Sequence, residues 1–204
     1  LIGAGMAGYL LGTVPSADVA CRVAGGGADL RSSGTNNPGG ANALVVLGRS
    51  WGYAVMAADI AKGAGACVLG RRLAGDNGAH VGGMAAVVGH CFPVWNGFRG
   101  GKGVAASLGQ CAGTFPVYVP VDLALAWATA LPRWRSRTYT ATAIASTAWV
   151  ATATLWWRRG WPNPGGPKPT AALPASAAAT SALILSRFAV AAHRAAARAG
   201  AVSS

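Results

Sequence analysis

Long apolar stretches, separated by short segments rich in Gly, Pro and charged residues, recur along the whole chain. A helix that crosses a bilayer needs about 20 mostly apolar residues. Seven stretches meet or approach this length, although Pro116 and Pro120 interrupt the fourth and fifth, which leaves a kinked or re-entrant segment as an alternative there. Their approximate ranges are 1–22, 51–70, 79–96, 103–116, 117–132, 138–157 and 170–191. The sequence therefore predicts an all-α, polytopic integral membrane protein of about seven transmembrane helices, forming a single domain over 1–204.

The composition argues against a soluble protein. Hydrophobic residues make up 52% of the chain and charged residues 11%, whereas soluble domains average about 25% charged residues. The net charge of +12 raises nucleic-acid binding as an alternative, but the cations are spread between the apolar stretches and not collected on one helix. We therefore expect a lipid bilayer and an anionic substrate as partners, and no nucleic acid. The four cysteines form no CxxC pair, so we expect no metal site.

The distribution of Lys and Arg predicts the orientation, because cytoplasmic loops carry the excess of these residues. With the N-terminus outside, the outer side holds Arg71, Arg72, Arg158, Arg159 and Lys168. The inner side then holds Arg22, Arg31, Arg49, Arg99, Lys102, Arg133, Arg135, Arg137, Arg187, Arg194 and Arg198. This excess favours an outside N-terminus and an inside C-terminus in a multi-pass protein of the cytoplasmic membrane. It also places both glycine-rich loops on one face. We expect the segment from Leu1 to Cys21 to be a retained span and not a cleaved signal peptide.

The segment from Gly89 to Gly103 has the composition of a phosphate site. Glycines allow successive backbone amides to approach an anion, a lysine adds a point charge, and a helix beginning near Gly103 adds its positive end. The candidate ligands are His90, Arg99, Gly100, Gly101, Lys102 and Gly103. A flexible basic loop that serves only topology is the alternative. For His90, a structural imidazole and a catalytic one are equally compatible with the sequence.

A second polar loop runs from Arg22 to Asn42 and is too rich in Gly, Ser, Asn and Pro to be helical. Its hydroxyls, amides and N–H groups suit the oxygens of an anion, and Arg31 can bind a phosphate bidentately. The candidate ligands are Arg31, Thr35, Asn37, Gly39 and Asn42. A disordered linker is the alternative. Upstream, Thr13-Val14-Pro15 breaks the first span and predicts a cavity lined by a hydroxyl and freed carbonyls.

Asp59 and Lys62 lie three residues apart in the second span, where either charge alone is costly to bury. We expect them to pair. A purely structural pair is one interpretation, and a Lys62 that also neutralises substrate phosphates is the other.

These motifs resemble the PlsY family, bacterial membrane acyltransferases that acylate glycerol 3-phosphate from acyl phosphate. The family's Gly-Ser-x-Pro corresponds to Gly12–Pro15, with Thr13 in place of serine. Its Asp-x-Arg loop corresponds to Asp29–Asn42, and its Asp-x-x-Lys-Gly to Asp59–Gly63. The most specific match is Gly-His-x-Phe-Pro followed by Phe-x-Gly-Gly-Lys-Gly-Val-Ala, which occurs from Gly89 to Ala105.

The C-terminal third departs from the family pattern. The family's Arg-Tyr-x-Ser element corresponds at best to Arg137–Thr140, which makes Thr140 the counterpart of a catalytic serine. The family's last motif, Arg-His-x-x-Asn-Ile-x-Arg, fits Arg187–Arg194 and places Phe188 and Ala191 where a His and an Asn of the active site belong. His193 in a shifted register is a possible substitute.

The resemblance implies acyl transfer from acyl phosphate to the 1-hydroxyl of glycerol 3-phosphate, giving lysophosphatidic acid in the first step of phospholipid synthesis. Arg31, Lys102, Thr13 and Thr140 would be catalytic, and no cofactor or metal would be needed, because acyl phosphate is already a reactive anhydride. An impaired relative that only binds lipid, motivated by Phe188 and Ala191, is one alternative. A phosphate or other anion transporter is a more distant one, because the chain shows no inverted repeat. The sequence does not predict the oligomeric state.

Overall fold

The computed structural model describes residues 1–25, 27–130 and 137–202, and within these ranges every regular element is helical. The N-terminal half contains α1 (Ile2–Gly12), α2 (Ser16–Ala24), α3 (Gly40–Val46) and the long α4 (Arg49–Cys91). A short 3-10 turn, η1 (Val94–Asn96), leads to α5 (Val104–Thr114), η2 (Pro116–Tyr118) and α6 (Val119–Ala130). The chain ends with α7 (Thr138–Arg159) and α8 (Ala172–Val202). The predicted all-helical class is confirmed.

Helix α4 is two antiparallel arms and not one rod. Ala74 and Gly75 leave the helical region, and Gly75 takes a positive φ of 65°, which glycine adopts without a steric penalty. The predicted spans 51–70 and 79–96 are these two arms, and the second ends at Cys91, before its predicted limit. Small residues allow the arms to pack closely, because a Cβ on Gly70 or Gly78 would collide with the facing backbone.

Two further predictions of helix boundaries need correction. The predicted span 1–22 is divided at Thr13–Pro15 into α1 and α2, because Pro15 cannot continue the helical hydrogen bonding. The polar loop from Arg22 to Asn42 is helical at both of its ends, where α2 finishes and α3 begins at Gly40. The expected interruption at Thr13–Pro15 is therefore confirmed. The prediction that the whole loop is non-helical is wrong at its two ends, which belong to α2 and α3.

The stretch around Pro116 forms two short helices, as the interrupted pattern allowed. Helices α5 and α6 contain 11 and 12 residues. At 1.5 Å per residue each is roughly 17 Å long, about half of the hydrocarbon thickness of a bilayer. By length and apolar composition, the stretches able to cross a membrane are Arg49–Asn96 and Ala172–Ala197 among the described residues. The inner-side cations Arg133 and Arg135 lie outside the described residues.

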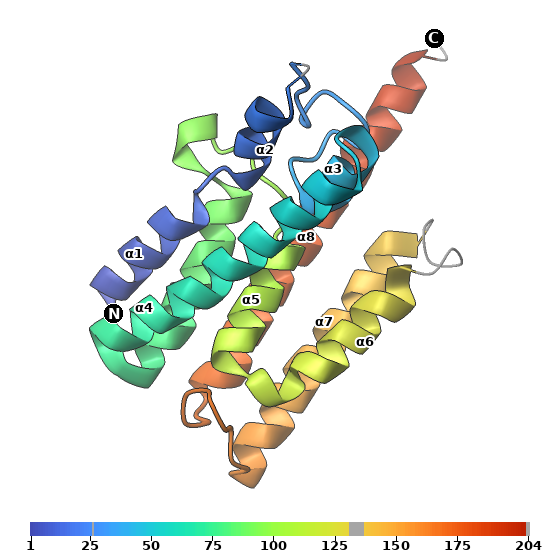
Figure 1. Cartoon of the computed structure of the whole chain (residues 1–204). Helices are drawn as coiled ribbons and strands as arrows, with labels where there is room; N and C mark the ends of the chain where they lie inside the picture. The colour runs from blue at the N-terminus through green and yellow to red at the C-terminus, as the bar shows by residue number, and fades with distance from the viewer. Residues whose placement is uncertain (26, 131–136, 203–204) are drawn as a thin grey trace.

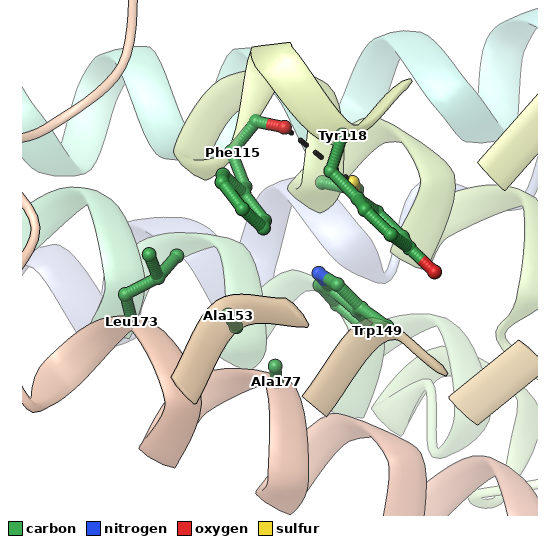
Figure 2. Close-up of a cluster of buried hydrophobic side chains, with 7 residues drawn as sticks. Phe115, Tyr118, Trp149, Ala153, Leu173 and Ala177 are labelled. Atoms are coloured by element: carbon green, nitrogen blue, oxygen red, sulfur yellow. Dashed lines mark hydrogen bonds between the residues drawn. The ribbon is translucent and has the colours of Figure 1, made fainter. Parts of the chain in front are cut away.

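The helices form a bundle from which the α6–α7 hairpin diverges (Figure 1). Helix α1 and α5 pack against α4, and α7 packs against α8. The hairpin is joined to the bundle at one end by a cluster of buried residues from α5, η2, α7 and α8, shown in Figure 2. Phe115 and Tyr118 stack there with centroids 5.5 Å apart, opposite Trp149, Leu173 and Ala177. The other end of the hairpin lies apart from the bundle, at the end where α4 finishes and α5 begins.

Candidate active site

The two glycine-rich loops meet at one end of the bundle. The Arg31 Nε donates a hydrogen bond to the carbonyl of Arg99 over 3.0 Å, although 68 residues separate them. Helices α2 and α3, which flank the first loop, lie at this same end in Figure 1. The expectation that both loops share one face of the protein is therefore confirmed in the fold.

A buried carboxylate organises the interior beneath the loops. Asp59 lies 2.9 Å from the Lys62 Nζ, and the exposed fractions of the two side chains are 2% and 6%. The Ser16 hydroxyl donates to the same carboxylate, and the His90 Nδ1 lies 3.5 Å from it. Lys62 also donates to the carbonyl of Val14 over 3.1 Å, at the break between α1 and α2. The predicted Asp59–Lys62 pair and the freed carbonyl are both confirmed.

This arrangement is not a serine hydrolase triad. In a triad the imidazole lies between the serine and the carboxylate, so that it removes the proton of the hydroxyl. Here the carboxylate of Asp59 lies between Ser16 and His90 instead. Ser16 is held as a hydrogen-bond donor and is not activated as a nucleophile. The cluster is suited to orienting His90 and Lys62 beside a substrate.

The glycines of the second loop serve a different purpose from the expected one. The Gly100 amide donates to the carbonyl of Cys91 over 3.2 Å, and the Gly101 amide to that of His90 over 3.1 Å. These amides satisfy the end of α4, whose last carbonyls have no partner within the helix. The prediction that they turn toward an anion is wrong for these two positions. A Cβ on Gly101 would lie 3.0 Å from the Cε1 of His90, so the glycine is needed for close packing.

Arg187 of α8 supports the same loop and was missed as a site residue. Its Nε donates to the carbonyl of Gly101 over 3.2 Å and its Nη2 to that of Gly100 over 2.9 Å. The guanidinium also lies over the ring of Phe92, 4.9 Å from the centroid. In the sequence Arg187 was counted only as a topological cation, although it begins the last motif of the resembled family.

Lys102 stands at the start of α5, between the loop and a large cavity. Its Nζ lies 4.3 Å from the centroid of the Phe188 ring. Burial lowers the pKa of the Lys102 ammonium from its ordinary value. Gly103, with a φ of +91°, forms the N-cap of α5 without any side-chain cap. The first amides of α5 are therefore available beside a cation. His193, the alternative in a shifted register, is exposed on α8. The residue beside Lys102 is Phe188 instead.

Arg31 is already bound to a carboxylate in this structure. Its Nη1 and Nη2 lie 2.5 and 3.2 Å from the two oxygens of Asp18. The Asn96 amide donates to the same carboxylate over 2.7 Å. The guanidinium thus makes the bidentate contact expected of it, with an aspartate in the place of a phosphate. Its role toward a phosphate stays a prediction.

The remaining candidates of the first loop divide into two groups. Asn42 is buried and holds the loop: its Nδ2 donates to the carbonyls of Leu30 and Ser33, each over 2.9 Å, and its Oδ1 accepts from the Thr35 amide. With these bonds made, Asn42 has a structural role in place of the expected contact with substrate. The side chain of Thr35 is exposed and that of Asn37 is half-buried, whereas Gly39 lines the large cavity.

Of the two hydroxyl residues predicted to be catalytic, one lines a hollow of the candidate site. Thr13 is buried, donates to the carbonyl of Leu10 and accepts a 3.0 Å hydrogen bond from the Trp95 indole. Thr140 is exposed at the start of α7 and does not line either pocket of the site. The cavity face of α7 carries Thr142 and Ser146, because a position two residues away points to the opposite side of a helix. The predicted serine counterpart is therefore misplaced.

Two hollows meet at His90. The larger has a volume of about 400 Å³ and lies between α4, α5, α6, α7 and α8, with a mostly apolar lining and Lys102 and Gly103 at one end. The smaller, of about 20 Å³, has polar and charged side chains in its lining, among them Thr13, Arg31 and Lys62, beside Gly101. His90 lines both. An elongated apolar ligand with an anionic end fits the first, and a small polar group the second.

Comparison with known proteins identifies relatives over most of the chain. The family model described as glycerol-3-phosphate acyltransferase matches residues 2–199. A glycerol-3-phosphate acyltransferase of Allorhizobium ampelinum is 40% identical over 59% of this chain and 58% of its own length. One of Brucella suis is 37% identical over 76% of this chain and 65% of its own. The chain thus matches less than two thirds of the length of these relatives.

The fold is similar to that of a solved membrane protein. The crystal structure of PlsY (YgiH), an integral membrane glycerol 3-phosphate acyltransferase, in its glycerol 3-phosphate form matches with a TM-score of 0.74 and 27% identity. The match covers 96% of this chain and 92% of that one. The lysophosphatidic acid form of PlsY matches with a TM-score of 0.70 at 24% identity, which concerns the fold alone.

Proposed function

The chain belongs to the glycerol-3-phosphate acyltransferase family, and from this premise we propose that it transfers an acyl group from acyl phosphate to the 1-hydroxyl of glycerol 3-phosphate. The products are lysophosphatidic acid and phosphate. The observation that carries the proposal is the large cavity, which is mostly apolar along its length and cationic at the end formed by Lys102 and the start of α5. This distribution matches a molecule with one alkyl chain and one terminal phosphate.

Acyl phosphate occupies the large cavity in this proposal. Its phosphate lies at the N-terminus of α5, where free amides and Lys102 favour a negative charge. Its chain extends between α5 and the α6–α7 hairpin. The cavity wall there is formed largely by small residues, including Ala126, Ala141 and Ala145. The small apolar side chains leave room for an alkyl chain, and the polar groups of the backbone behind them are paired within the helices.

Glycerol 3-phosphate binds in the polar hollow on the other side of His90. At about 20 Å³ this hollow has room for roughly one water molecule, so it widens when the substrate binds. The phosphate of the substrate replaces Asp18 as the partner of Arg31, since both are oxyanions suited to a bidentate guanidinium. Lys62 adds a second positive charge. The repulsion between the two substrate anions is thereby offset.

The transfer itself requires no acyl-enzyme. The glycerol oxygen forms a bond to the carbonyl carbon, the bond between that carbon and the bridging phosphate oxygen breaks, and the departing phosphate takes the hydroxyl proton. His90, held by Asp59, orients the attacking hydroxyl from the boundary between the two hollows. No metal or organic cofactor takes part in these steps.

We place the protein as a single multi-pass domain in the cytoplasmic membrane, with both loops and the C-terminus inside. The apolar stretches of α4 and α8 and the excess of cations on the loop side support this orientation. Glycerol 3-phosphate then reaches its site from the cytoplasm, whereas the acyl chain enters from the lipid.

The direct test uses purified protein, acyl phosphate and radiolabelled glycerol 3-phosphate. Label that becomes extractable into organic solvent as lysophosphatidic acid supports the proposal, and acyl-CoA serves as the control donor. Label that accumulates unchanged inside reconstituted vesicles supports a transporter instead. If neither occurs while the protein still binds acyl phosphate, the impaired relative is the better description.

A further inference from the structure

Asp122 is the unexplained acidic residue of this protein. The other four aspartates, Asp18, Asp29, Asp59 and Asp76, each form an ion pair with an Arg or Lys. Asp122 has no ion pair and no hydrogen bond to any described residue, although it lies in the apolar helix α6 and lines the large cavity. Asp122 is half-buried, and an ionisable side chain in an apolar helix is costly, which is usually tolerated where the residue contacts a ligand or pathway. A hydrogen-bonding group of a bound ligand would offset this cost.

A second polar group lies at the same level of the cavity. Asp122 is eight residues before the end of α6, and Ser146 is eight residues after the start of α7. Because the two helices form an antiparallel hairpin, both residues lie about 12 Å from the helix ends that face each other across the connection. Ser146 is buried, lines the same cavity and makes no hydrogen bond to the described part of the chain. A carboxylate acceptor and a hydroxyl donor therefore line one zone of the cavity.

This zone lies at the far end of the cavity from the phosphate site. Trp149, one turn beyond Ser146, lines the cavity and belongs to the aromatic cluster with Phe115 and Tyr118 (Figure 2). Lys102 stands before the first residue of α5, and Phe115 follows its last one, so the helix separates them by roughly 16 Å. The cluster thus forms the floor of the cavity, and Asp122 and Ser146 lie just above it.

We propose that this cavity selects acyl chains that carry a hydroxyl group in the part of the chain distant from the carbonyl. The hydroxyl donates its hydrogen bond to the Asp122 carboxylate and accepts one from the Ser146 hydroxyl. A plain alkyl chain leaves both groups without a partner in an apolar surrounding, which penalises its binding. This inference rests on the proposed function for the identity of the ligand, and it adds the class of chain that the same site prefers.

The test measures binding, so that it does not depend on catalysis. Three probes compete with a fluorescent fatty acid for the purified protein: a saturated fatty acid, its isomer hydroxylated near the methyl end and its isomer hydroxylated near the carboxyl group. We expect the first hydroxylated isomer to bind roughly tenfold or more tightly than the other two probes, since a hydrogen bond to a charged group is among the stronger ones. Asp122→Leu should abolish this preference. Asp122→Asn, which keeps the shape of the side chain, should reduce it.

Ala126→Leu is the matched control, because Ala126 lines the same cavity one turn further along α6. It should weaken all three probes by a similar factor. Equal binding of the probes to the unaltered protein, no binding of any probe, or a preference that persists in Asp122→Leu would each overturn the inference. Selective binding without formation of lysophosphatidic acid would instead refute the proposed reaction alone.

Discussion

Replacing Asp59 with leucine should destabilise the protein strongly, because three side chains depend on its carboxylate. Lys62 would keep a single hydrogen bond to the Val14 carbonyl, and its side chain is only 6% exposed. Removing one partner of a buried ion pair costs about 3–5 kcal/mol, since the remaining charge is left in an apolar surrounding. Ser16 and His90 would lose their common acceptor as well. We therefore expect a loss of at least 3 kcal/mol in the free energy of unfolding, by the same estimate.

A second substitution separates two effects of Asp59→Leu: the unpaired charge left on Lys62 and the loss of the other contacts of Asp59. In the double variant Asp59→Leu with Lys62→Met no unpaired charge remains, and about 1–3 kcal/mol should be recovered. The recovery is incomplete because the Val14 carbonyl then lacks its donor. Lys62→Met alone should cost less than Asp59→Leu, since Asp59 would keep Ser16 and His90 as partners.

Denaturant titration in detergent micelles measures these free energies, with Asp76→Leu as the matched control. Asp76 pairs with Arg71 over 3.0 Å, but the exposed fractions of the two side chains are 38% and 46%. Exposed pairs contribute about 0–1 kcal/mol. Asp76 also accepts a 2.9 Å hydrogen bond from the exposed Lys168 amide, which water can replace, so the control should cost much less than Asp59→Leu. If Asp59→Leu were no more destabilising than Asp76→Leu, or if the double variant recovered nothing, the buried network would not have the energetic role assigned to it.

Substitutions at three further positions test the loop and the phosphate site by the rate of lysophosphatidic acid formation. Lys102→Ala should lower activity roughly tenfold or more, whereas Lys102→Arg should retain part of it. Because burial lowers the pKa of Lys102, the activity should fall at a lower alkaline pH than it would with an ordinary lysine. In Lys102→Arg the activity should persist to a higher pH, because a guanidinium stays charged. The same alkaline limit of activity in both proteins would contradict this. Gly101→Ala should lower activity by displacing the His90 ring. The control Gly3→Ala should not, because a Cβ added at Gly3 has no atom within 4 Å, and equal effects of the two substitutions would refute the close-packing argument. Phe188→His should raise activity by placing a hydrogen-bonding ring beside Lys102, and an unchanged rate would show that the departure from the family pattern is harmless.

The features that sequence predicted well are local ones. The break at Thr13–Pro15 follows from the chemistry of proline, and the pairing of Asp59 with Lys62 follows from their spacing of three residues on one helix. The glycine-rich motif before α5 predicted a phosphate site at Lys102; the structure places Lys102 in the lining of the large cavity, and the binding of phosphate there stays a prediction. In each case the physical constraint lies within a few residues of the chain, so a pattern is sufficient to detect it.

The features that sequence could not predict depend on contacts between distant segments. Asn42 looks like a ligand because its amide is polar, but three loop backbone groups use its hydrogen bonds. Arg31, in the loop, looks free until Asp18 of α2 is placed against it. Thr140 was misplaced because the orientation of α7 is set by its packing, which directs Thr142 into the cavity. These outcomes require the coordinates of the partners and not only the type of the residue.

The hydrogen bonds of the loop between α4 and α5 arrange this end of the bundle in a way that favours the phosphate of the proposed substrate. The C-terminus of a helix carries partial negative charge, and its last carbonyls would repel a phosphate. Here the carbonyls of His90 and Cys91 accept the amides of Gly101 and Gly100, and the loop carbonyls in turn accept the guanidinium of Arg187. The negative end of α4 is thus covered by donors, whereas the positive end of α5 is left without a side-chain cap beside Lys102. In the proposed reaction the glycines therefore contribute to phosphate binding indirectly. Their amides neutralise the C-terminus of α4, which would otherwise oppose an anion, and are not themselves offered to the phosphate.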